Sequence, residues 1–284
     1  MKRNFVFKLG SSLFLMTLLG VMSVAEASYL RLVPTMEIIS SGPGKILVKG
    51  SMKNEGDEQA VDVKLQSIRG ELILADFGNI EMSGTKSFSV ELTEKQLDLE
   101  TPGFHQVPFR ILYRDGNRVP FSSTFLQSYT LKPGTLPEPE PPVLITFGKP
   151  INGNGAIDVV DTAALEMTLN NSSKNEVDVR LEMIEPREMK FSLSQSAMKL
   201  GPGETKNVEI KIQNAGALTG SAYVIFALVS GVSQGRAFAN YGSFVTNIVV
   251  KADLPWIPIL IGVLIALFVA VDLFRRFRKS SAKS

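Results

Sequence analysis

An internal repeat is the feature that most constrains how this chain can fold. The segment Val61–Ile68 reappears as Val177–Ile184 with its alternation of apolar and charged residues intact, and each copy follows a polar turn that contains asparagine. Two further pairs of segments match in the same order, Thr85–Val90 with Thr205–Ile210 and Gly103–Ile111 with Gly220–Leu228. Ordered matches at nearly constant separation indicate two copies of one fold.

The period within each copy is two residues. In the first copy Val61, Val63 and Leu65 fall on one face of an extended chain and the charged residues fall on the other, as a half-buried strand requires. The same alternation recurs in Phe88–Leu92, Val107–Tyr113 and Val208–Ile212. Turn signals separate these runs, at Asn54–Asp57, Asp115–Asn117, Asn170–Ser173 and Gly201–Gly203. These patterns predict an all-β body of two tandem immunoglobulin-like (Ig-like) antiparallel β-sandwich domains.

Charge and cysteine content exclude several classes of function. The chain has 284 residues and a formal net charge of +2, which is too weak a field to attract nucleic acid. It contains no cysteine, so disulfides, thiolate metal sites, cysteine nucleophiles and lipid attachment through cysteine are all excluded. Because many secreted animal Ig domains carry a buried disulfide, its absence favours an envelope protein of a bacterium or archaeon.

The N-terminal residues have the pattern of a secretory signal peptide. Basic residues precede an apolar run at Leu13–Val24, and the small-x-small sequence Ala25–Ala27 follows it. We predict a signal peptide at residues 1–27, and the sequence leaves open whether it is cleaved after Ala27. An uncleaved N-terminal anchor or a core helix is the alternative, and the anchor would leave the body exported as well.

The C-terminal residues predict one transmembrane helix. Leu254–Val271 is an uncharged run of 18 residues, long enough to cross most of a hydrocarbon core. Trp256 at its outer end suits the membrane interface, and a basic cluster beyond its inner end is retained on the cytoplasmic side. The predicted anchor residues are Trp256, Arg275, Arg276, Arg278 and Lys279. The body is then expected outside the cytoplasm, in the periplasm or at the cell surface.

Composition also predicts the domain boundaries. Leu136–Pro142 alternates proline with glutamate and should form a stiff, extended linker. The predicted segments are a signal peptide (1–27), a first sandwich (28–131), the linker (132–142), a second sandwich (143–252), the transmembrane helix (253–274) and a basic cytoplasmic tail (275–284).

Two local motifs resemble those of known envelope proteins. Asn54–Gly56 followed by Val61–Val63, and Leu200–Glu204 followed by Val208–Ile212, are similar to the turns of bacterial proteins built from tandem CARDB-like or NEW3-like immunoglobulin-type modules. The resemblance spans most of residues 29–250 and implies Ig-type domains that bind other molecules. The order of leader, two Ig-like domains and terminal span also resembles the WxL-interacting surface proteins, which implies attachment of a partner to the cell wall. A two-domain body is similar to the pilus chaperones as well, although those lack a terminal anchor.

Signatures of catalysis are weak. His105 is the only histidine, and it lies in phase with Val107 and Phe109 and aligns with Ala222 of the second copy, which favours a structural role at the start of a strand. A Ser-His-Asp triad would have to use this histidine, and the chain has no G-x-S-x-G elbow. We therefore expect no catalytic residues, no cofactor and no enzymatic activity.

Other polar groups are expected to be solvated turns and loops instead of metal or phosphate sites. The carboxylate pairs lack the dense spacing of a calcium loop, and the glycine-containing loops precede no helix. These groups are Asp57 with Glu58, Asp158 with Asp161, Glu138 with Glu140 in the linker, Gly42–Gly44 and Gly153–Gly155. Asn170 and Asn171 each begin an N-glycosylation acceptor sequence, which matters only in a host that performs the modification.

The aromatic residues are the one feature of the body that points to a surface. Phe121 and Phe125 are an even number of residues apart, so they lie on the same face of a strand, which favours the core. Of Phe238, Tyr241 and Phe244, only the two phenylalanines share a face in this way. A binding edge at these aromatics stays open.

The sequence thus predicts a membrane-anchored, extracytoplasmic binding or scaffold protein that recognises an envelope protein or a polysaccharide. The alternatives are a periplasmic assembly chaperone, which would lend an edge strand to subunits, and an accessory subunit of an envelope enzyme complex. A deep pocket with converging polar groups would favour an enzyme, and shallow faces would favour an interaction protein.

Overall fold

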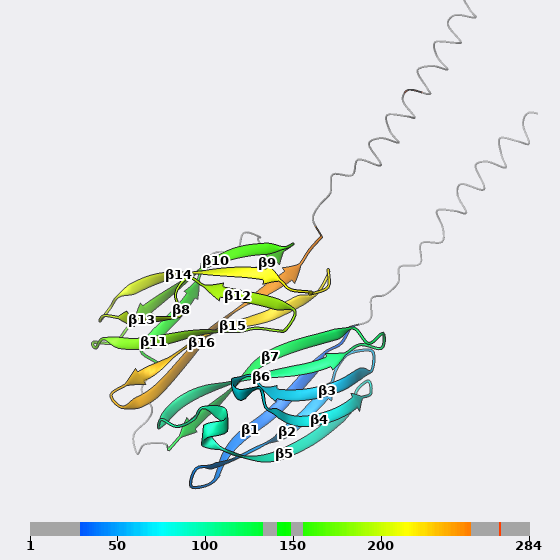
Figure 1. The fold of residues 1–284 in the computed structure, drawn as a ribbon, viewed down its shortest axis with the longest axis horizontal. Coiled ribbons are helices and arrows are strands. Elements are labelled where there is room, and N and C mark those ends of the chain that lie inside the picture. The colour runs from blue at the N-terminus through cyan, green and yellow to red at the C-terminus, as the bar shows by residue number, and fades with distance from the viewer. Residues whose placement is uncertain (1–28, 133–140, 149–155, 251–266, 268–284) are drawn as a thin grey trace, which may run out of the picture. The chain divides into compact units, whose positions relative to one another are not determined.

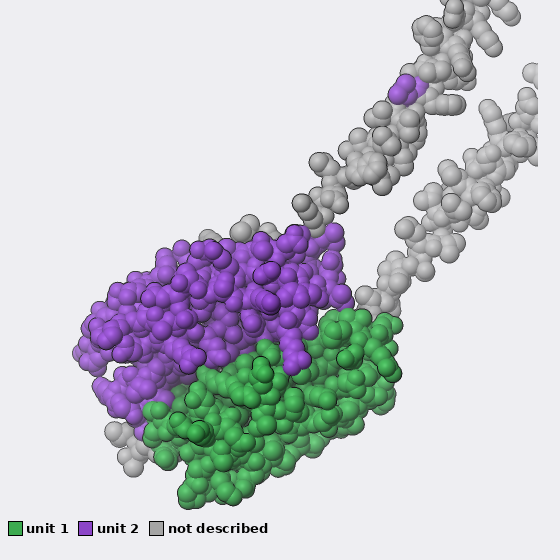
Figure 2. Space-filling model, in the orientation of Figure 1, with its two compact units in different colours: residues 1–136 green, residues 137–284 purple. Residues whose placement is uncertain are grey.

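The computed structural model describes residues 29–132, 141–148, 156–250 and 267, and the chain divides into two compact units, residues 1–136 and 137–284 (Figures 1 and 2). These ranges are almost entirely β, in sandwich-like sheets. No helix within them is long and apolar enough to cross a membrane. The predicted signal peptide, the five predicted anchor residues and Glu138 with Glu140 lie outside the described residues.

Unit 1 is a sandwich of two antiparallel sheets. One sheet has the order β1-β2-β5 and the other β4-β3-β6-β7. The strands are β1 (Leu32–Gly42), β2 (Lys45–Asn54), β3 (Ala60–Ser67), β4 (Ile73–Ile80), β5 (Thr85–Thr93), β6 (Gly103–Arg114) and β7 (Pro120–Leu131), with two 3-10 helices, η1 (Arg69–Glu71) and η2 (Glu94–Leu97). In a constant-type Ig domain the fourth strand pairs with the fifth, whereas here β4 pairs with β3.

Unit 2 repeats this plan with additional strands. Its sheets have the orders β12-β14-β10-β8 and β13-β11-β15-β16, and β9 lies parallel to the end of β16. The strands are β8 (Val143–Phe147), β9 (Ala156–Val159), β10 (Thr162–Asn171), β11 (Val177–Ile184), β12 (Met189–Leu193), β13 (Ala197–Leu200), β14 (Thr205–Asn214), β15 (Ala222–Ser233) and β16 (Arg236–Ile248). Residues 194–196, between β12 and β13, carry the chain from one sheet to the other.

The inward faces of the paired sheets form a separate apolar core in each unit. In β11, Val177, Val179 and Leu181 are all buried, which confirms the predicted face. The equivalent prediction for β3 is partly wrong. Asp62 has a φ of 53°, and Asp62 and Val63 both lie opposite a single residue of β6, so a β-bulge turns Val61 away from the core.

The third matched pair of segments is offset by one residue from the predicted alignment. Leu65 pairs with Ile111 of β6, and its counterpart Leu181 pairs with Val229 of β15. Ile111 therefore corresponds to Val229 and not to Leu228. His105 by the same register corresponds to Tyr223 and not to Ala222. A shift of one residue moves a side chain to the other face of a strand, so the distinction decides which residues of β15 are in the core.

A buried asparagine ends β2 in unit 1 and the equivalent strand, β10, in unit 2. Asn54 and Asn171 are both fully buried. The Nδ2 of Asn54 donates to the carbonyls of Glu58 and Ile80, and the Nδ2 of Asn171 donates to those of Asn175, Leu200 and Gly201. Each Oδ1 accepts a backbone N–H two residues further on. In each copy, the side-chain hydrogen bonds of this asparagine therefore hold together the turns at one end of the sandwich, and we call this set of bonds the closure.

Candidate functional site

His105 lies in β6, opposite Tyr129 of β7, and is only 9% exposed. Its Nε2 lies 2.7 Å from the carbonyl oxygen of Thr101. The carbonyl can only accept, so Nε2 carries the proton and donates. The ring joins the loop before β6 to the strand, as expected for a structural residue.

The predicted solvated acids are in turns and strand ends. Asp57 Oδ1 accepts from the backbone N–H of Tyr29 at 2.7 Å, and Asp158 Oδ1 accepts from Asn247 Nδ2 at 3.3 Å. Gly42–Gly44 forms the turn between β1 and β2, whereas Gly153–Gly155 lies outside the described residues. Within the described ranges, no group of three or more His, Cys, Asp and Glu side chains could hold a metal ion.

The two glycosylation acceptor sequences differ in access. Asn171 is fully buried and uses its amide in the closure described above, so an oligosaccharyltransferase could not reach it in the folded chain. Asn170 points to the opposite face of β10, where its Nδ2 donates to Thr205 Oγ1 at 2.8 Å.

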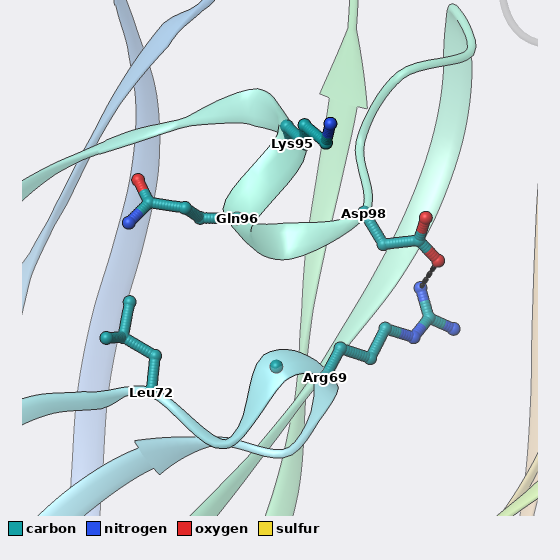
Figure 3. A pocket seen from close by; sticks show the side chains of 6 residues that line it. Arg69, Leu72, Lys95, Gln96 and Asp98 are labelled. Carbon is teal, nitrogen blue, oxygen red and sulfur yellow. Dashed lines mark ion pairs between the residues drawn. The ribbon is translucent and has the colours of Figure 1, made fainter.

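A hollow of about 240 Å³ lies at one end of unit 1, between η1 and η2 (Figure 3). Its lining residues are Arg69, Gly70, Leu72, Lys95, Gln96 and Asp98. A capping box between Thr93 and Gln96 begins η2, and Leu97 and Leu99 anchor this segment in the core. Asp98 in the left-handed region ends η2 and faces Arg69, whose Nη1 lies 3.7 Å from Asp98 Oδ2.

This hollow is a weak candidate for a ligand site. Its volume is below the roughly 300–1,000 Å³ of most small-molecule pockets. Arg69 and Asp98 largely neutralise each other, which leaves Lys95 as the main charge. The size and charge of the hollow are therefore more typical of a gap between two turns than of a substrate pocket.

Most of the aromatic residues are in the cores. Phe125 stacks on Phe109 with centroids 5.5 Å apart, and Phe121 stacks on Tyr113 at 5.9 Å. Phe238 and Phe244 are buried in unit 2. The shared parity of Phe121 and Phe125 thus predicted their inward direction correctly.

Among the aromatic residues that the sequence singled out, Tyr241 lies outside the core, on the outer face of β16. It is 45% exposed, and its ring meets Phe226 of β15 edge to face at 5.8 Å. Val224 is 50% exposed on the same face, directly opposite Val245. We call these four residues, Val224, Phe226, Tyr241 and Val245, the Tyr241 patch.

The Tyr241 patch differs from the equivalent face of unit 1. At the matching positions β6 carries Gln106, Pro108 and Arg110, whereas β15 carries Val224, Phe226 and Leu228. The sequence does contain a signal of this outer apolar face. In the run Ala222–Val229 both sets of alternating residues are apolar, so neither face of the strand has the polar side chains that a solvent-facing side usually carries. The one-residue error in alignment concealed this signal, because it placed Val224 and Phe226 in the core.

No protein-family model and no curated protein matches the chain. Among solved structures, it is similar to PapD-like domain 7 of human CEP192, with 16% identity and a TM-score of 0.32 over 43% of this chain and 95% of that one. It is similar to the YadV chaperone, with 12% identity and a TM-score of 0.31 over 75% and 98% of the two chains. For Escherichia coli alpha-2-macroglobulin activated by porcine elastase the values are 11% and 0.27, over 79% of this chain and 22% of that one. Likenesses of this size carry no argument about function.

Proposed function

We propose that this chain is a membrane-anchored binding protein of a cell envelope, and that the Tyr241 patch is the surface by which it recognises a partner outside the cytoplasm. The observation that carries the proposal is an apolar, aromatic cluster on a sheet face where alternation would ordinarily place polar residues. Clustered exposed apolar side chains in a soluble domain commonly mark an interaction site.

The chemistry of the patch favours a protein partner. Sugar recognition combines an aromatic ring with several surrounding hydrogen-bonding groups. Directly across the strands, Tyr241 lies opposite Leu228, and Phe226 lies between Ile184 and Ser243, so the surroundings of the two rings are mainly apolar. Tyrosine adds a hydroxyl at the rim of an otherwise apolar contact, a combination that is enriched at the centres of protein interfaces. A flat sheet face also suits a protein surface better than it suits a small molecule.

The anchor gives this binding its location. A leader at residues 1–27 and a span at 253–274 would hold both sandwiches on the outer side of the membrane. The division of labour is then simple, because the β-domains recognise the partner and the C-terminal segment fixes the complex at the membrane.

The test is capture of the partner from native membranes with tagged full-length protein and with Tyr241→Ala. Loss of an interface tyrosine should weaken binding about tenfold, and partner recovery should fall accordingly. Leu144→Ala is the matched control, because Leu144 is 49% exposed on β8 of the opposite sheet. Equal recovery by wild type and Tyr241→Ala would refute the patch as the binding surface. Tyrosine-dependent recovery of a polysaccharide would keep the surface and replace the class of partner.

A further inference from the structure

The last strand of unit 2 is held by hydrogen bonds to its end. The N–H of Ile248 donates to the carbonyl of Ser221 at 2.9 Å, and the N–H of Gly220 donates to the carbonyl of Ile248 at 2.8 Å. On the other side, β9 pairs with β16 up to Ile248, and the N–H of Val249 donates to the carbonyl of Val159 at 3.0 Å (Figure 1). The chain is therefore part of the sandwich as far as Val249.

The loop bonded to this strand end is uncharged. Residues 215–221 contain only alanine, glycine, leucine, threonine and serine. Asn214 Oδ1 accepts from the N–H groups of Gly216 and Ala217, and Ala217 is buried, so the loop is tied down at its start. Leu218 is 46% exposed at this end of the unit, where Val250 is 71% exposed.

Chain length places these two side chains near the predicted span. Only residues 251–253 lie between Val250 and Leu254, the first residue of the uncharged run. A fully extended chain at up to 3.6 Å per residue puts the Cα of Val250 within about 14 Å of that of Leu254. The polar layer of a bilayer is itself roughly 5–7 Å thick on each side, so little room remains between this end of unit 2 and the lipid.

We propose that the end of unit 2 formed by loop 215–221 and Val250 rests on the bilayer interface beside the chain's own anchor. This proposal depends on the membrane anchoring in the proposed function. Leu218 and Val250 meet the interface, where partial burial removes their exposed apolar surface from water. Arg187 and Glu188 lie beside the loop, since the N–H of Ala215 donates to the carbonyl of Glu188, and these charges limit the contact to the headgroup level.

The contact fixes how unit 2 stands on the membrane. The opposite end of the unit carries the turns at 172–176, 201–204 and 234–235, and it is directed away from the lipid when loop 215–221 faces it.

Site-specific fluorescence tests this contact, because the chain has no cysteine of its own. Full-length Thr219→Cys and Lys174→Cys are each labelled with a polarity-sensitive dye and reconstituted into phosphatidylcholine vesicles that contain a nitroxide-labelled lipid. Thr219 and Lys174 are exposed at opposite ends of unit 2. The lipid quencher should reduce the Thr219→Cys signal several-fold more than the Lys174→Cys signal, and adding Leu218→Glu should remove the excess.

The possible failures are separable by flotation of the same vesicles. Equal quenching of both labels in protein that floats with the vesicles would overturn the contact and leave the anchor intact. Protein that does not float with the vesicles would overturn the anchor, and with it both the contact and the proposed location.

Discussion

Asn54 and Asn171 are buried side chains that play the same role in the two copies, because each donates hydrogen bonds to the carbonyls of the turns around it. An unpaired amide in a core costs more than a hydrogen bond returns, so such a residue is tolerated only where every partner is in place. Asn171 meets this condition with three carbonyls within 2.9 Å. The amide thereby ties the start of one turn to the end of β13.

We predict that Asn171→Ala destabilises unit 2 by about 2–4 kcal/mol, because it leaves buried carbonyls without their donor. The neighbouring Asn170→Ala should cost much less, since Asn170 bonds only at the sheet surface. Urea unfolding followed by circular dichroism compares the two variants. Similar losses in both would show that the closure is not what stabilises this end of the sandwich.

The two cores use different residues at matching strand positions. In unit 1, Phe109 stacks on Phe125 across β6 and β7. At the matching positions of unit 2 stand Ala227 and Gly242, and the volume is taken by Phe147 of β8, since a Cβ on Gly242 would come within 2.7 Å of the Phe147 ring. A phenylalanine from a different strand thus takes part of the space that a ring of β7 occupies in unit 1.

Burial of Tyr223 makes the stability of unit 2 depend on pH in the alkaline range. Burial, together with the nearby Glu188 carboxylate, raises the pKa of Tyr223 to about 12 from the ordinary 10. A raised pKa means that the stability contributed by the neutral phenol is complete below pH 10 and is lost as the pH rises towards 12.

Tyr223→Phe should therefore abolish this alkaline loss. The Tyr223 hydroxyl is buried and forms no hydrogen bond of good geometry among the described residues, although the Ser221 side chain lies near enough to lower the pKa in part, so at neutral pH the variant should lose little stability. Urea midpoints between pH 8 and pH 11.5 provide the measurement. A variant that loses stability with alkali as steeply as the wild type would contradict the assignment.

At the scale of elements, the turn between β13 and β14 depends on a carboxylate. Glu204 Oε2 accepts from the N–H of Gly201 at 2.6 Å, and this bond, followed by the ion pair with Lys206, lowers the pKa of Glu204. A lowered pKa stabilises the fold above the unfolded value of 4.5, and the contribution is lost as the pH falls through the folded value.

Glu204→Gln should accordingly flatten the acid limb of the stability curve, and it should change stability at neutral pH only slightly, because the group is exposed and its charge is screened by solvent. Glu209→Gln, at an exposed position of β14, is the control. The relevant measurement is the urea midpoint from pH 7 down to pH 3. If both variants retain the wild-type acid dependence, the turn bond has no part in it.

Strand existence and most strand faces could be predicted from the sequence, whereas register could not. A period of two is unambiguous where polar residues alternate, as in β11 and β14. It gives no answer in Ala222–Val229, where both parities are apolar, and it does not reveal the bulge at Asp62, which depends on a single backbone angle. The sequence left open a binding edge at Tyr241, but it could not group Val224 and Phe226 with this residue, for the first of these reasons.

At the scale of the whole molecule, the repeat predicted two copies of one β fold because matching segments in matching order leave little alternative. A binding surface has no comparable signature, since it is assembled from outward residues of neighbouring strands whose register must be known first. Tyr241 and Phe226 are adjacent in space only because β15 and β16 pair as they do.

The most direct test of the account is partner capture by the tagged full-length protein against a version that lacks residues 254–284, the former from gently solubilised native membranes and the latter from the extracytoplasmic fraction. We predict that both recover the same envelope partner, because recognition belongs to the β-sandwich units and the C-terminal segment only holds them in place. Recovery by the full-length chain alone would contradict this, and it would assign recognition to the C-terminal segment.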